Sequence, residues 1–252
     1  MTLAKYTRSA FFSRYAMALL AVVLIGFAPS FFLRLVIESE PLPFYLHLHG
    51  ALLTGWFAIV CGQALLIRKD DVMLHRRLGR FFAVYGAAVA IAALMATFNW
   101  VERELAMGAT FESDMAAVNP LQASGVSFQD FAAALVCFNL ASVLGFVVLL
   151  ALAVVFRREG SHHKRYVLFA SLSIVTPGVA RISRIVMQTE MGPIIPLGIA
   201  GLGLAILIAD FQSLGRLHPA SLRASLILFI VNGVAGFVAL SPYGARLVRA
   251  LA

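Results

Sequence analysis

The chain has 252 residues, of which 61% are apolar and only 13% carry a charge. Soluble domains are nearer half apolar and a quarter charged, so this composition excludes an ordinary soluble protein. The formal net charge of +8 comes from short basic clusters between apolar runs, a pattern typical of membrane topology, so nucleic acid is excluded as a partner.

Seven apolar runs are each long enough to cross a bilayer, which takes about 20 residues in a helix. The first run follows basic residues, as in a signal peptide, but it is long and no A-x-A cleavage motif follows it, so we expect a retained helix. The sequence predicts an all-α, polytopic membrane helix bundle that forms one domain over residues 1–252. In chain order, the predicted helices are 15–37, 43–67, 80–100, 131–156, 166–188, 193–211 and 220–240.

The basic residues predict an orientation for this bundle. With a cytoplasmic N-terminus, fourteen of the twenty Lys and Arg residues fall in inner segments and six in outer ones. An excess of Lys and Arg marks the cytoplasmic side of a membrane protein. We therefore expect a multi-pass protein of the bacterial inner membrane, in contact with membrane lipid, with an outward C-terminus.

Four polar residues stand in the outer part of two predicted helices. His47 and His49 follow the start of helix 43–67, and Arg181 and Arg184 lie near the end of helix 166–188, above a kink expected at Pro177. A rise of about 1.5 Å per residue places the histidines and the arginines at similar depth. Ionisable residues at membrane depth are candidates for functional sites.

A seven-residue spacing extends the outer group inward along one helix face. His49, Trp56 and Gln63 share this face, whereas His47 points almost the opposite way. Guanidinium and imidazole groups suit an anionic or carbonyl-bearing ligand, such as a quinone, a carboxylate or a haem propionate. The alternative is that the arginines reach lipid headgroups and the histidines are interfacial. The predicted ligand-binding residues are His49, Arg181, Arg184, His47, Trp56 and Gln63.

The other four histidines lie on the cytoplasmic side, each just ahead of a predicted helix. They are His75, His162, His163 and His218. A haem b or a metal ion held between His75 and either His162 or His163 is the pairing that we predict. The alternative is that these histidines are interfacial residues in basic loops beside lipid phosphates.

Several other classes are excluded by missing motifs. The sequence has no histidine boxes of membrane di-iron desaturases, no HExxH motif and no Gly-rich phosphate loop. The last predicted helix has no lysine for retinal. Cys61 and Cys137 lie apart in apolar segments and indicate neither a disulfide framework nor a zinc site.

Three segments resemble a poorly characterised family of bacterial multi-pass membrane proteins. They are LHLHG with the following Trp and Gln, HRRLGRF, and HHKRYVLFASLSIVTPGVARI. This resemblance covers residues 43–184 and implies a shared fold, with no established activity to carry over. The histidines at helix ends are also similar, more weakly, to transmembrane cytochromes b and ferric-reductase-like proteins, which would imply electron transfer. The outer histidines have no histidine partner on another helix, which is against a two-haem arrangement.

Two functional hypotheses follow. The first is an inner-membrane protein with an intramembrane His/Arg site that serves haem- or quinone-linked redox work. The second is a non-enzymatic component, either a small-molecule permease or an assembly partner of a membrane complex. The sequence shows neither internal repeats nor paired broken helices of the kind found in many transporters.

Overall fold

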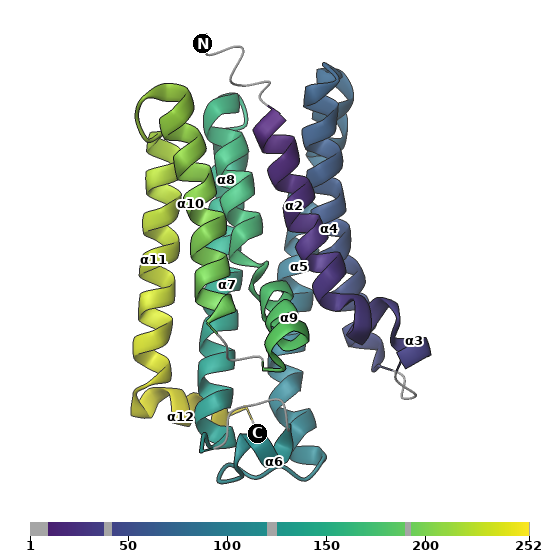
Figure 1. Cartoon of the computed structure of the whole chain (residues 1–252), viewed down its shortest axis with the longest axis vertical. Coiled ribbons are helices and arrows are strands. Elements are labelled where there is room, and N and C mark those ends of the chain that lie inside the picture. The colour runs from purple at the N-terminus through teal and green to yellow at the C-terminus, as the bar shows by residue number, and fades with distance from the viewer. Residues whose placement is uncertain (1–9, 38–41, 120–124, 190–192, 252) are drawn as a thin grey trace.

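A computed structural model describes residues 10–37, 42–119, 125–189 and 193–251. Every regular element within these ranges is a helix, which confirms the all-α prediction. The long helices run side by side along one axis of the molecule (Figure 1). In chain order the elements are α2 (Ala10–Phe27), η1 (Ala28–Phe32), α3 (Arg34–Ile37), α4 (Phe44–Arg68), α5 (Val72–Ala106), α6 (Met115–Val118), α7 (Phe128–Val155), α8 (Gly160–Ser173), α9 (Thr176–Met187), α10 (Ile194–Leu214), α11 (Pro219–Ala239) and α12 (Pro242–Arg249).

Six of these helical segments are long and apolar enough to cross a membrane. They comprise α2 together with η1, and then α4, α5, α7, α10 and α11. The pair α8 and α9 is bent by 47° at a short break and makes a seventh span if it is counted as one. The bend lies where a kink at Pro177 was predicted. Pro177 stands in the first turn of α9 and has no backbone N–H to bond to the preceding helix, so the helix breaks there.

The helix ends differ from the predicted ones for local reasons. The helix predicted over 80–100 extends from Val72 to Ala106, since the Asp71 side chain accepts a hydrogen bond from the backbone N–H of Leu74 and caps an earlier start. The first helix begins at Ala10 rather than at residue 15 and ends in the π-helical turn η1, which contains Pro29.

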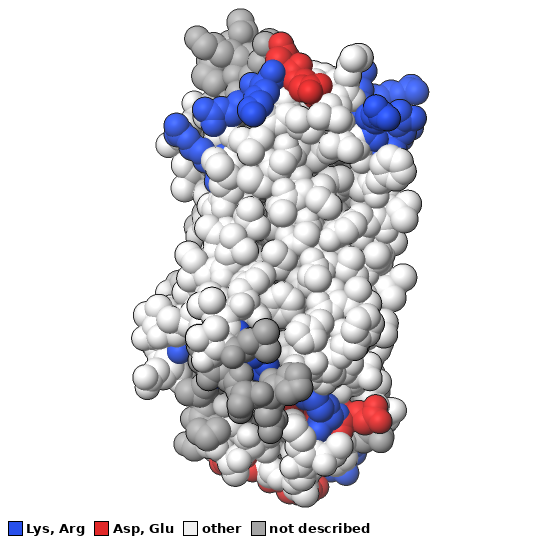
Figure 2. Space-filling view, turned by 90° about the vertical axis from the view of Figure 1, so that its right-hand side faces the viewer, with Lys and Arg blue, Asp and Glu red and all other residues white. Residues whose placement is uncertain are grey.

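Charged and apolar residues divide the surface as expected for spanning helices. On the face shown in Figure 2, charged residues lie toward the two ends and the broad band between them carries none. Large apolar side chains in the spans are exposed, among them Phe229 and Phe237 on α11. These side chains would meet lipid tails in a bilayer.

The main core lies between α2, α4, α5, α7 and α8. Trp56, Phe57 and Phe146 are almost completely buried there. Four helices, α2, α5, α8 and α11, begin at the same end of the bundle (Figure 1), which we call the N-terminal end. At the opposite end, α6 and α12 cover the tips of α5 and α7, with Met115 and Val248 buried between them.

Candidate functional sites

Arg181 and Arg184 line a pocket of about 360 Å³ between α9 and the first span, away from the N-terminal end. Pockets for small molecules usually measure about 300–1,000 Å³. The guanidinium carbon of Arg181 also lies 6.0 Å from the centre of the Phe27 ring. The pocket is therefore large enough for a small organic ligand, and it carries two positive charges from one helix. Its lining residues are Gly26, Pro29, Ser30, Arg181, Arg184, Ile185 and Gln188.

A close approach of two backbones forms one wall of this pocket. A Cβ atom added to Gly26 on α2 would overlap the carbonyl group of Gly178 on α9. Glycine at this position lets the two helices pack closely, as small residues do between membrane helices. Because the chain bends before α9, α9 does not continue the direction of α8. Arg181 and Arg184 therefore lie against the first span.

His49 does not line the Arg181 pocket. Its Nδ1 atom lies 3.2 Å from the backbone carbonyl oxygen of Ala92 on α5, and it donates a hydrogen bond there. Tyr85 on α5 donates in turn to the carbonyl of Leu52 on α4 at 2.9 Å. These two hydrogen bonds join α4 to α5, which indicates a structural role for His49.

The other predicted ligand residues on α4 are also placed apart from the pocket. The ring centre of His47 lies 6.0 Å from that of Phe31. Trp56 is fully buried, and its Nε1 donates to the Oγ of Ser171 at 3.1 Å. Gln63 lies toward the N-terminal end of the bundle. Of the six predicted residues, the structure brings Arg181 and Arg184 together, and His47, His49, Trp56 and Gln63 are not among the lining residues.

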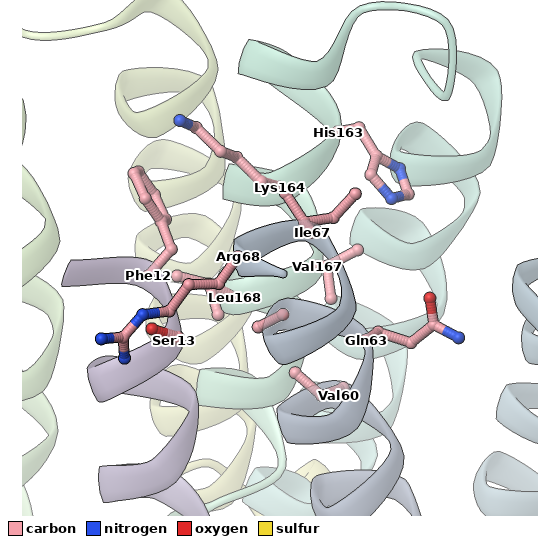
Figure 3. Close-up of a pocket in the computed structure, with 11 residues that line it drawn as sticks. Phe12, Ser13, Val60, Gln63, Ile67, Arg68, His163, Lys164, Val167 and Leu168 are labelled. Carbon is pink, nitrogen blue, oxygen red and sulfur yellow. The ribbon is translucent and has the colours of Figure 1, made fainter. Parts of the chain in front are cut away.

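A second, smaller cavity lies at the N-terminal end between α2, α4 and α8 (Figure 3). Its volume is about 90 Å³, and its polar lining includes Gln63, Arg68, His163 and Lys164. In the view of Figure 3, Gln63 and His163 point to one side, whereas Arg68 and Lys164 point to the other. The Oε1 atom of Gln63 is buried and has no hydrogen-bond partner among the described residues.

The four inner histidines form two pairs. They stand in the first turn of a helix or cap it, rather than preceding it as predicted. The ring centres of His75 and His163 are 6.2 Å apart, and those of His162 and His218 are 4.7 Å apart. His163 donates from Nδ1 to the carbonyl oxygen of Ala153 at 2.8 Å. Of the two residues predicted to pair with His75, His163 is the one whose ring lies beside it.

His218 caps α11, since its Nδ1 accepts a hydrogen bond from the backbone N–H of Ala220 at 3.1 Å. Burial, the positive charge of Arg165 and the neighbouring His162 lower the pKa of His218 to about 4. The cap requires a neutral imidazole, because a protonated Nδ1 has no lone pair to accept with. The structure therefore holds His218 neutral at physiological pH.

A buried ion pair joins three helices beside these histidines. Arg165 on α8 and Asp210 on α10 are both completely buried. The Nε atom of Arg165 lies 3.1 Å from each carboxylate oxygen, its Nη2 also donates to Oδ1, and Ser221 on α11 donates to Oδ2. Sequence reasoning missed this network, although an acid inside the apolar run of α10 is a signal for a buried partner.

Comparisons with known proteins give no relative for this chain. No protein-family model, no curated protein and no solved structure matches it. Among the described residues, no group of three or more His, Cys, Asp or Glu side chains is placed to hold a metal ion.

Proposed function

We propose that this chain is a protein of the bacterial inner membrane that binds a small anionic or carbonyl-bearing molecule between α2 and α9. The proposal takes α8 and α9 as one span, which gives seven spans, and takes the N-terminus as cytoplasmic from the fourteen-to-six distribution of Lys and Arg. The pocket then lies in the outward half of the membrane, open to a ligand such as a quinone or a carboxylate.

The observation that carries the proposal is the pair of arginines in one pocket. Arg181 and Arg184 are one helical turn apart and both line the space of about 360 Å³. Guanidinium groups donate several hydrogen bonds in fixed geometry, which suits carboxylate, phosphate and carbonyl oxygens. A hydrogen bond to a charged group contributes about 1.5–3 kcal/mol. Losing one such bond lowers affinity by about 10-fold to 150-fold.

Arg181→Gln and Arg184→Gln test this proposal in protein purified in detergent. Co-purifying small molecules are identified by native mass spectrometry, and the binding of dodecanoate and of a short-chain benzoquinone is measured by the shift in thermal unfolding. We expect each variant to lose the co-purifying molecule and to bind one of the probes at least about tenfold more weakly. The matched control is Arg246→Gln on α12, an exposed arginine that lies against the Tyr243 ring.

The outcomes separate a ligand site from headgroup contact. Unchanged binding in both pocket variants would refute the proposal. A loss of bound anionic phospholipid in all three variants alike would mean that the arginines only reach lipid headgroups.

A permease is a second candidate, favoured by the break between α8 and α9. Discontinuous membrane helices often surround the substrate site of a transporter. Uptake of the identified ligand into proteoliposomes, abolished by Arg181→Gln, would support this candidate. Binding without uptake would support a ligand-binding protein rather than a permease.

A further inference from the structure

We propose that His75 and His163 are the two protein ligands of a transition-metal centre at the N-terminal end of the bundle. This site is separate from the arginine pocket, and the inference does not depend on the function proposed for that pocket. The two imidazoles come from different helices, α5 and α8. Their ring centres are 6.2 Å apart, and the ring planes are nearly perpendicular, at 83°.

This separation is compatible with one shared metal that has the two rings on opposite sides of it. Metal–nitrogen bonds of about 2.1 Å on either side of one ion place the two nitrogens about 4.2 Å apart. Each ring centre lies a further ring radius beyond its nitrogen, so the expected separation is close to the one observed.

Hydrogen bonding prepares His163 as a ligand. Its Nδ1 must carry the proton, because the Ala153 carbonyl oxygen at 2.8 Å can only accept. The lone pair is therefore on Nε2. Metal-bound histidines nearly always donate their other ring nitrogen to such a carbonyl or carboxylate, which fixes the tautomer and the ring orientation.

On the opposite helix, His75 keeps a nitrogen open. Its Nδ1 atom is buried and has no hydrogen-bond partner among the described residues. The ring faces the backbone carbonyl of Gln63, and the buried Oε1 of Gln63 also has no partner. Unpartnered buried polar atoms are rare because each costs about 1–3 kcal/mol. A bound metal would satisfy His75 directly and would offer Gln63 a ligand position or a metal-bound water.

The chemistry selects a first-row transition metal, either as an ion or as the iron of haem. Imidazole ligands suit iron, copper, nickel and zinc. Haem iron needs only two axial ligands from the protein, which His75 and His163 would supply. A bare ion needs less room than a porphyrin, for which the helices would have to separate, because the cavity of about 90 Å³ beside His163 is small and His75 does not line it.

The test uses the full chain, expressed with iron, copper and haem precursor in the medium and purified in detergent. Metal content is measured by mass spectrometry, and absorption is recorded before and after reduction with dithionite. We expect about one metal atom per chain. A sharp reduced band identifies haem, and metal without a porphyrin band identifies an ion.

Two ligand variants and one control decide the assignment. His75→Gln and His163→Gln should each reduce the metal to less than a tenth of the wild-type content. His162→Gln is the matched control, because His162 is adjacent on α8 but pairs with His218. His75→Gln is the decisive variant, because the Nδ1 of His75 has no hydrogen-bond partner among the described residues and the glutamine amide can still donate to the Gln63 carbonyl that the ring faces. Metal-free wild-type protein, or full metal content in folded His75→Gln, would overturn the inference whatever the result at the arginine pocket.

Discussion

Replacing Asp210 by alanine should destabilise this protein more than most single substitutions. The carboxylate of Asp210 accepts hydrogen bonds from Nε and Nη2 of Arg165 and from Ser221. Without it, the guanidinium of Arg165 stays fully buried, with its Nη1 bond to the carbonyl of Ser161 at 2.6 Å. Breaking a buried ion pair by removing one partner costs about 3–5 kcal/mol, because a buried charge is left uncompensated.

The free energy of unfolding in mixed detergent–SDS micelles measures this effect. A double variant, Arg165→Met with Asp210→Leu, removes both charges and should recover most of the loss, since apolar replacements of buried ion pairs are often neutral or stabilising. The control is Asp71→Ala, which removes only the exposed cap of α5 and should cost about 1 kcal/mol.

Two results would contradict this role of the ion pair. If Asp210→Ala costs no more than Asp71→Ala, the buried pair does not hold α8 to α10. If the double variant loses as much stability as Arg165→Met and Asp210→Leu lose in sum when made singly, the charges are not coupled in the folded protein.

Three further predictions concern packing and pH. The pKa of His218 is about 4 in the folded chain and about 6.5 when unfolded. As the pH falls, the imidazole of His218 is therefore protonated in the unfolded chain before it is protonated in the folded chain. The free energy of unfolding should decrease as the pH drops from about 6.5 to 4. His218→Asn, which can still cap α11, should flatten that slope, and an unchanged slope would exclude His218 as its source. Gly26→Ala should cost about 1–3 kcal/mol in an unfolding titration, because its Cβ has no room against α9. Gly62→Ala, which has open space, should be neutral; equal effects at the two glycines would contradict this account. Trp56→Ala should lower the free energy of unfolding by about 3–5 kcal/mol, because it removes a packed side chain, whereas Ser171→Ala removes only a hydrogen bond and should cost about 0.6 kcal/mol. Equal losses in the two variants would show that packing of the indole ring is not the larger contribution.

Hydropathy was enough to predict the bundle because each span must satisfy its own backbone hydrogen bonds. The bend at Pro177 was also predictable, since proline cannot continue the hydrogen bonding of the preceding turn. The start of α5 was missed, although Asp71 ahead of the predicted helix is a recognisable cap. Apolar length alone does not show where a helix ends once it leaves the membrane.

Sequence reasoning did not predict which way the side chains of the candidate site point. Arg181 and His49 were placed level by counting residues along their helices. Counting does not show which helices are neighbours or how each is rotated about its axis. In the fold, α4 turns His49 toward α5, and α9 turns Arg181 toward α2. For the same reason Arg165 and Asp210, 45 residues apart, were not recognised as partners.

The bent pair α8 and α9 separates the two candidate sites in space as well as in sequence. Its α8 half is tied to its neighbours by polar contacts. Ser173 donates to the carbonyl of Ser142 on α7 at 2.7 Å, His163 donates to Ala153, and Arg165 binds Asp210. His163 and Arg181 are 18 positions apart, which corresponds to about 27 Å along a straight helix. Sites that far apart without shared partners are expected to behave additively. The 47° bend lies between them, so α8 is held by its polar contacts while α9 lines the arginine pocket together with the first span.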